Sequence, residues 1–194
     1  MIAFVSGKFV TRLPSQVIVD VNGVGYDLQI SLNTYSAISN KEEGKLFTYL
    51  HITENAQTLF GFSDMEEKEL FLQLISVSGV GASTARMMLS GLKTDEIIRC
   101  IVNNNTKQLE SIKGIGKKTA ERIVLELKDK LNRLQTNQQN SAYSHNTVET
   151  DALNALVSLG IQRNTAESAL KKVILSNGDN QSIENIIKLA LKNL

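Results

Sequence analysis

The sequence predicts an α+β protein with several small domains: a β-rich N-terminal part followed by two helical parts. Three observations lead to this fold class. The hydrophobic period changes from strand-like to helical at residue 63, and a glycine-containing segment recurs after 35 residues. An amide-rich stretch around residue 140 has no apolar period. These features divide the chain into residues 1–62, 63–134, 135–149 and 150–194.

The N-terminal range, 1–62, is expected to contain about five short strands. Asn22-Gly23 interrupts a run of β-branched residues and is a strong signal for a hairpin turn. The expected strands lie at residues 2–9, on both sides of the turn within 17–30, at 47–52 and at 58–62. Short strands at this density favour a small closed barrel of the OB-fold type.

The central range, 63–134, is expected to be helical and to contain two helix–hairpin–helix motifs. Ser63 or Asp64 can cap its first helix. Gly79-Val-Gly81 and Gly114-Ile-Gly116 each precede an amphipathic helix and are each followed by a threonine–alanine pair. A single Gly-x-Gly is a weak signal, but two copies in the same context indicate an internal duplication.

The second glycine loop has the features of an anion site. The start of a helix leaves backbone N–H groups unpaired, and Lys117 and Lys118 add positive charge there. Residues 113–133 contain seven basic and three acidic residues, although the whole chain has a formal net charge of only +1. A nucleotide is not the expected ligand, because the segment 111–118 departs twice from the pattern G-x-x-x-x-G-K-[S/T]. Two such loops suit a nucleic-acid backbone held at two points.

Metal, cofactor and catalytic sites are not expected. The single cysteine, Cys100, lies in an apolar run and is predicted to be a core residue. The two histidines, His51 and His145, are far apart in the sequence. The N-terminus lacks the pattern of a signal peptide, and no apolar run reaches membrane-spanning length, so a cytoplasmic location is expected.

The C-terminal range, 150–194, is expected to form a three-helix bundle of the ubiquitin-associated type after a flexible linker, 135–149. Each helix has a candidate N-cap: Thr150 or Asp151, Asn164 or Thr165, and Ser182. Gly160 is expected to end the first helix. The range has no catalytic constellation and indicates a docking module. Its apolar residues Leu156, Leu159 and Ile161 can be either bundle core or an exposed docking surface.

Taken together, these parts resemble the RuvA family, the DNA-binding subunits of bacterial Holliday-junction branch-migration complexes. The resemblance covers nearly the whole chain and rests on residues 23–26, 54–62, 79–81, 113–122 and 155–161. It implies a non-catalytic homotetramer, or an octamer on DNA, that binds four-way junctions and holds them open and square. It also implies that the chain recruits the hexameric ATPase RuvB for branch migration in recombination and repair, and it allows the resolvase RuvC as a further partner.

The resemblance also implies roles for individual residues. DNA binding would fall to both hairpins and the helices after them, through Gly79, Val80, Gly81, Ser83, Thr84, Arg86, Gly114, Ile115, Gly116, Lys117, Lys118 and Arg122. Glu54 and Asn55 would form an acidic pin near the crossover. Leu156, Leu159 and Ile161 would dock RuvB.

The chain departs from the family pattern in two places. Relatives commonly carry two acids in the pin, whereas Glu54 is followed here by Asn55, so a tetramer would hold four carboxylates rather than eight. The first hairpin often carries a lysine after its second glycine, but this chain has residues 82–84, Ala-Ser-Thr, with Arg86 as the candidate replacement. DNA binding is therefore expected to depend more on the second hairpin.

Two alternatives of other classes stay open. A repair enzyme such as a glycosylase or nuclease could use the hairpins for grip, but it would need a catalytic carboxylate cluster or a lysine in a pocket. A protein–protein scaffold could use the barrel and the bundle to dock partners. A gel-shift assay that compares a four-way junction with duplex DNA would separate the scaffold from a junction-binding protein.

Overall fold

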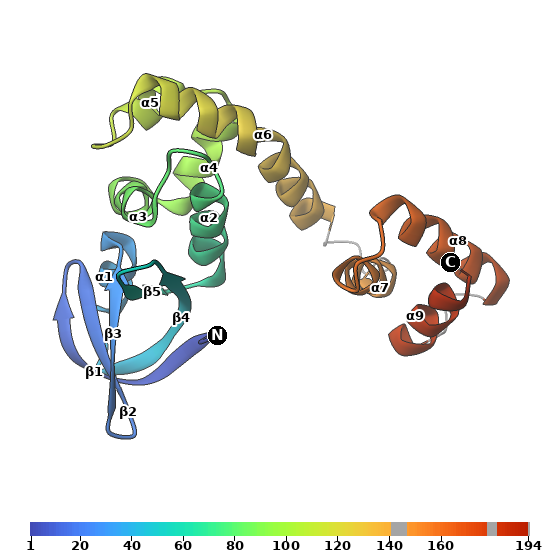
Figure 1. The fold of residues 1–194 in the computed structure, drawn as a ribbon, viewed down its shortest axis with the longest axis horizontal. Coiled ribbons are helices and arrows are strands. Elements are labelled where there is room, and N and C mark those ends of the chain that lie inside the picture. The colour runs from blue at the N-terminus through green and yellow to red at the C-terminus, as the bar shows by residue number, and fades with distance from the viewer. Residues whose placement is uncertain (141–146, 178–181, 194) are drawn as a thin grey trace. The chain divides into compact units, whose positions relative to one another are not determined.

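The computed structural model describes residues 1–140, 147–177 and 182–193 (Figure 1). Contacts between residues divide the chain into two compact units, Met1–Arg133 and Leu134–Leu194. The first unit holds both the β-rich range and the central helical range, so these two ranges pack against each other. Of the helices in the described ranges, none combines the length and the apolar character needed to cross a bilayer.

Five strands at the N-terminal end of the first unit close into a barrel. They are β1 (Phe4–Leu13), β2 (Gln16–Val21), β3 (Val24–Ile30), β4 (Glu43–Ile52) and β5 (Gln57–Phe62). Their order around the barrel is β1-β2-β3-β5-β4; β3 and β5 run parallel and the other pairs are antiparallel. Alternating side chains such as Val17 and Val19 of β2 fill the interior. The expected OB-fold barrel is confirmed.

The turn between β2 and β3 lies at Asn22-Gly23, as predicted. Asn22 has φ 52° and Gly23 has φ 88°, the left-handed values that a two-residue hairpin turn requires. The short helix α1 (Leu32–Ile38), between β3 and β4, was not predicted. Only Thr34 and Ile38 of this helix are buried, so its apolar period is too short to stand out in the sequence.

The central range forms five helices around one apolar core. They are α2 (Met65–Ile75), α3 (Ala82–Gly91), α4 (Thr94–Val102), α5 (Thr106–Glu110) and α6 (Lys117–Asn140). The pairs α2–α3 and α5–α6 are the two expected helix–hairpin–helix units, and both contribute to the same core, for example through Phe71 and Ile123. Asp64 caps α2, because its carboxylate accepts the Glu67 N–H at 2.8 Å.

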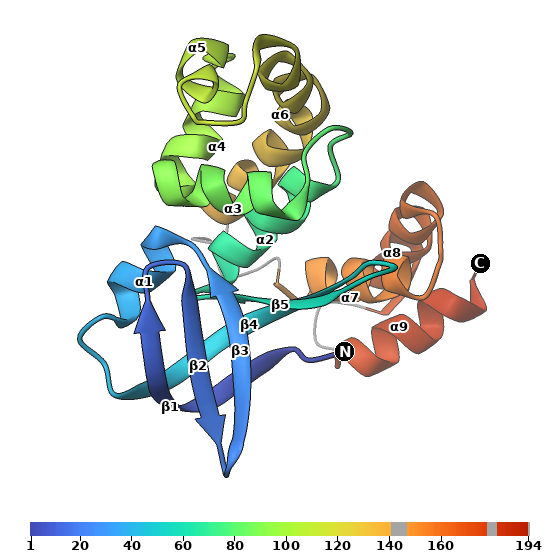
Figure 2. The ribbon, with the colours of Figure 1, turned by 60° about the vertical axis from the view of Figure 1, so that its left-hand side comes forward.

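A buried polar network around Glu67 joins α2 to the barrel, beside which α2 and α3 lie in Figure 2. The carboxylate accepts hydrogen bonds from the hydroxyls of Ser31 and Thr34. These hydroxyls in turn accept backbone N–H groups: Ser31 Oγ from Thr34 at 3.0 Å, and Thr34 Oγ1 from Ser63 at 3.1 Å. Burial raises the pKa of Glu67, and the surrounding donors oppose that rise.

The second unit contains a three-helix bundle of α7 (Thr147–Ser158), α8 (Arg163–Asn177) and α9 (Ile183–Lys192). Two of its expected signals are confirmed: Ser182 caps α9, and Gly160, with φ 90°, follows the end of α7. The other caps are wrong. Thr150 and Asp151 lie inside α7, and Asn164 and Thr165 lie inside α8, because each helix begins earlier than expected.

The predicted linker, 135–149, is wrong at both ends. Helix α6 continues to Asn140, and α7 already begins at Thr147. Once the part of α6 that packs on the core through residues such as Leu131 has formed, each further residue adds a hydrogen bond without a new nucleation cost. A sequence rich in amides and without an apolar period can therefore still extend this helix. The remaining linker residues, 141–146 with His145, lie outside the described residues.

Candidate nucleic-acid interface

The two hairpins have the same backbone conformation. The first glycine of each, Gly79 and Gly114, has φ 92°, a left-handed value that side chains rarely adopt. The next residue closes the turn: the Val80 N–H donates to the Val77 carbonyl, and the Ile115 N–H donates to the Ile112 carbonyl, both at 3.0 Å. The duplication read from the sequence is therefore a duplication of structure.

Each hairpin is anchored by one apolar side chain that points into the core. Val80 and Ile115 are each 5% exposed. Their N–H groups are also used within the turn. Both residues were expected to contact DNA, and the structure corrects this, because neither offers a free donor or an accessible side chain. They hold the hairpins in place and leave the glycines at the surface.

The helix that follows each hairpin has a glycine directly before its first residue. The Gly81 carbonyl accepts the Ala85 N–H, and the Gly116 carbonyl accepts the Ala120 N–H, both at 2.9 Å. A glycine offers no side-chain cap, so the first N–H groups stay open. In contrast, side chains cap the starts of other helices: Ser31 for α1, Asp64 for α2, Asn105 for α5 and Ser182 for α9.

The glycine N–H groups at the hairpin surface are also open. In the part of the chain that the structure describes, we find no protein acceptor for the backbone N–H of Gly79, Gly81, Gly114 or Gly116. The second glycine of each hairpin has a further property. A Cβ atom on Gly81 or Gly116 would meet nothing within 4 Å, and neither residue has a left-handed φ. The fold therefore does not require glycine at these two positions, whereas close approach of a ligand would.

The two hairpins differ in charge. The second carries three exposed lysines, Lys113, Lys117 and Lys118, whereas the first carries the exposed Ser83 and the half-buried Thr84. Lys113 was not among the expected site residues. It directly precedes Gly114, so its place in the basic, glycine-containing segment could have marked it.

Two arginines expected to bind DNA are already engaged in the fold. Arg86 Nη1 donates to the Ser15 carbonyl at 3.0 Å and to Gln29 Oε1 at 2.6 Å, so it holds α3 against the barrel. Nη1 of Arg86 is therefore engaged within the fold, and its role as a replacement for the lysine missing from the first hairpin stays a prediction. Arg122 Nη1 donates to Ser78, to the carbonyl at 3.0 Å and to Oγ at 3.1 Å, and thus links α6 to the first hairpin.

The predicted acidic pin is the tip of the β4–β5 hairpin. The Thr53 N–H donates to the Ala56 carbonyl at 2.9 Å and closes the tip around Glu54 and Asn55. Both side chains are exposed. Figure 2 shows this hairpin projecting beyond the rest of the barrel. One carboxylate per chain is therefore presented at the end of a projecting element.

The three apolar residues expected to dock a partner have different environments in the bundle. Leu156 is 0% exposed and belongs to the core, so it is wrong as a surface residue. Ile161 is half-buried and packs against that core. Leu159 is 63% exposed, because it follows the last residue of α7 and lies outside the buried stripe of the helix.

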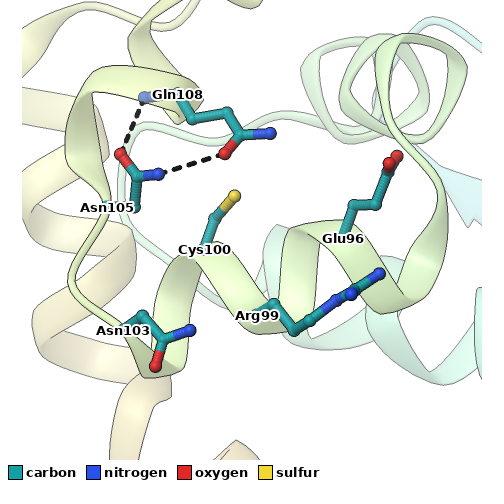
Figure 3. Close-up of a pocket in the computed structure, with 6 residues that line it drawn as sticks. All are labelled: Glu96, Arg99, Cys100, Asn103, Asn105 and Gln108. Carbon is teal, nitrogen blue, oxygen red and sulfur yellow. Dashed lines mark hydrogen bonds between the residues drawn. The ribbon is translucent and has the colours of Figure 1, made fainter.

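Cys100 is a core residue, as predicted. It lines a pocket of about 260 Å³, and two of the other lining side chains are hydrogen-bonded to each other (Figure 3). Asn105 Nδ2 donates to Gln108 Oε1 at 3.0 Å, and the Gln108 N–H donates back to Asn105 Oδ1 at 3.3 Å. Burial raises the pKa of the Cys100 thiol, and the Glu96 carboxylate acts in the same direction. The thiol therefore stays protonated and is a poor nucleophile.

Comparison with known proteins agrees with this arrangement over the whole chain. Three family models match: the RuvA N-terminal domain at residues 1–61, a SAM-like helix-hairpin-helix tandem at 71–129 and the RuvA C-terminal domain at 147–194. The chain is 43% identical to "Holliday junction branch migration complex subunit RuvA" of Cytophaga hutchinsonii, with 99% of each chain covered. It is 45% identical to the protein of the same name from Flavobacterium psychrophilum over all of both chains. The chain therefore belongs to the RuvA family.

Proposed function

We propose that this chain is a non-catalytic subunit that binds four-way DNA junctions as a tetramer and holds them open for branch migration. The observation that carries the proposal is the pair of hairpins with open N–H groups and a second glycine that the fold itself does not need. Unpaired N–H groups at a helix start bind phosphate oxygens, and glycine lets the DNA backbone approach them. Such contacts carry no sequence information, as a mobile crossover requires.

The pin supplies selectivity for junctions in this proposal. Four copies of Glu54 around the crossover repel phosphates, so a continuous duplex is disfavoured at the centre while separated strands can pass. Asn55 leaves this ring with half the charge that two acids would give. Asn55→Asp is therefore expected to raise the preference for a junction over linear duplex about threefold. An equal change in the affinities for junction and for duplex, measured by titration of labelled DNA, would exclude a role of the pin in junction selectivity.

The bundle docks a motor in this proposal, because the chain lacks the nucleotide-binding pattern that an ATPase needs. The relatives carry the name of a branch migration complex subunit, and the motor we propose is the hexameric ATPase RuvB. Leu159 is the most exposed apolar side chain of the described bundle. Leu159→Asp is expected to abolish stimulation of the motor while junction binding persists; Val148→Asp, at another exposed position, is the control.

The hairpin glycines give the direct test of DNA binding. Gly81→Ala and Gly116→Ala each add one methyl group where the protein has free space, so the thermal stability should not change. Each methyl group blocks the approach of a phosphate to donors worth about 1.5–3 kcal/mol when the acceptor is charged, so junction affinity should fall at least tenfold. Gly25→Ala, whose Cβ would only touch Ile18 at 3.6 Å, is the matched control. Unchanged affinity in both hairpin variants would refute the proposal.

Tetramer formation is tested separately by sedimentation. The wild-type chain should sediment as four subunits alone and retain junction binding. Cleavage of junction DNA by the pure protein would instead favour a repair enzyme. Absence of any binding to a junction or a duplex would favour a protein–protein scaffold.

A further inference from the structure

The Arg122 guanidinium lies on the first hairpin although Arg122 belongs to the second helix–hairpin–helix unit. Its Nη1 donates to both the carbonyl and the hydroxyl of Ser78, which is 44 residues earlier in the chain. The same nitrogen would be 4.0 Å from a Cβ placed on Gly79. The guanidinium therefore contacts the outer edge of the hairpin directly beside the glycine that makes the turn.

The first hairpin depends on its position more than the second does. It has no lysine, so within the proposed function its attraction for phosphate comes from N–H groups and hydroxyls. Hydrogen bonds weaken steeply with distance and angle, whereas a lysine charge tolerates small displacements. Val80 fixes the inner side of the hairpin from the core. Ser78 and Gly79 lie on its exposed outer side, where Arg122 makes the contact.

The same face of α6 serves both hairpins. Lys118 and Arg122 are four residues apart in this helix, so their side chains lie on one face. Lys118 lies next to the second hairpin, whereas the side chain of Arg122 contacts the first hairpin. The residue that corresponds to Arg122 in the first unit, 35 positions earlier, is Met87, which has no hydrogen-bond donor. This link is therefore made from the second unit to the first only.

We infer that Arg122 is a positioning residue: it clamps the first hairpin to α6, so that the two hairpins present their N–H groups to DNA at a fixed spacing. It acts through Ser78 and does not itself bind phosphate. The inference rests on the proposed function for its effect on DNA. The clamp in the free protein does not depend on that function, so it can be tested on its own.

Hydrogen exchange in the free protein tests the clamp without DNA. The Val80 N–H, bonded to Val77, reports on the first hairpin, and the Ile115 N–H, bonded to Ile112, is the matched reporter on the second. Arg122→Gln should speed exchange at Val80 about tenfold and leave Ile115 unchanged, because a hydrogen bond from a charged donor is lost on one hairpin only. Unchanged exchange at Val80 would overturn the clamp, whatever the protein binds.

The salt dependence of junction binding then separates a positioning residue from a phosphate ligand. Loss of one phosphate contact lowers the slope of log K against log[salt] by about 0.9. Arg122→Gln should weaken junction binding about tenfold with the slope unchanged, whereas Lys118→Gln should lower the slope by the full amount. Arg122→Lys keeps the charge but loses the guanidinium fork, so it should also weaken binding. A lower slope for Arg122→Gln, or wild-type affinity for Arg122→Lys, would show a phosphate ligand instead.

If the wild-type chain failed to bind any junction, the proposed function would fall. The exchange measurement would still decide whether Arg122 holds the first hairpin. A failure of the proposed function and a failure of the Arg122 clamp can therefore be told apart by experiment.

Discussion

The two helix–hairpin–helix units share one backbone design but differ in what surrounds it. The first unit is held from three directions: Glu67 ties α2 to the barrel, Arg86 ties α3 to the barrel, and Arg122 ties the hairpin to α6. The second unit instead carries three exposed lysines at its hairpin. The first unit thus contributes defined position, and the second contributes charge.

This difference shows how a duplicated motif can divide one task. A phosphate contact needs both attraction and placement, and a single loop can be optimised for either. A long-range charge can draw DNA in from many orientations, whereas uncharged donors select one geometry. Variants that change the charge of the second unit, or the contacts that support the first, test this division.

The largest effect is expected from removing the charge of the second unit. Lys117→Ala combined with Lys118→Ala should lower the salt slope of junction binding by about 1.8 and weaken affinity about 30-fold at physiological salt, because two phosphate contacts are lost. Titrations of labelled junction at several salt concentrations measure both quantities. Lys130→Ala, an exposed lysine further along α6, is the control and should leave the slope as it is.

An unchanged salt slope in the double variant would show that the lysines of the second unit do not contact phosphates. In that case the free N–H groups of both hairpins would have to supply the binding energy equally.

A smaller effect is expected from loosening the support of the first unit at Glu67. Glu67→Gln leaves one acceptor oxygen but replaces the other with a donor, which mismatches a hydroxyl of Ser31 or Thr34. The unfolding free energy of the compact unit Met1–Arg133, which contains this network, should fall by about 1–2 kcal/mol. Urea unfolding of the full chain, followed by exchange of core amides such as that of Phe71, measures it.

The pH dependence of this cost follows from the raised pKa of Glu67. A carboxyl group with a higher pKa in the folded state binds its proton more tightly there, so its stabilising contribution is complete below its unfolded value, near 4.5. That contribution is lost as the pH rises through the folded value. The difference in unfolding free energy between the wild type and Glu67→Gln should therefore be largest near pH 4 and become smaller towards neutral pH. If this difference increased with pH instead, the hydrogen-bond donors around the carboxylate would lower the pKa of Glu67 more than burial raises it.

The hairpins and the barrel could be predicted from the sequence because their signals are local. Asn22-Gly23 and the two Gly-x-Gly segments determine turns over a few residues, and a repeat after 35 positions shows the same turn twice. The helix start at Arg163 was missed because it follows Gln162, which is not a preferred N-cap residue. The start at Thr147 was missed because the cap-type residue Asn146 is one of several such residues in a polar run.

The roles of the arginines could not be predicted, because they depend on partners far away in the chain. Arg86 meets residues 71 and 57 positions earlier, and Arg122 meets one 44 positions earlier. In the sequence both are basic residues shortly after a glycine loop. An arginine that binds phosphate would have the same sequence context. The same holds for Leu156 and Leu159, which only the geometry of the bundle assigns to core and surface.

The smallest effect is expected from giving the first unit a charge of its own. Ser83 is exposed and occupies the position that Lys118 has in the second unit, so Ser83→Lys should add one phosphate contact. The salt slope should rise by about 0.9 and the affinity should increase about fivefold at physiological salt, because an already positioned hairpin gains attraction. Ser83→Gln adds length without charge and should leave the slope unchanged. If Ser83→Lys did not change the slope either, the first hairpin would lie too far from the DNA backbone for a charge to matter, and the division between position and charge would be wrong.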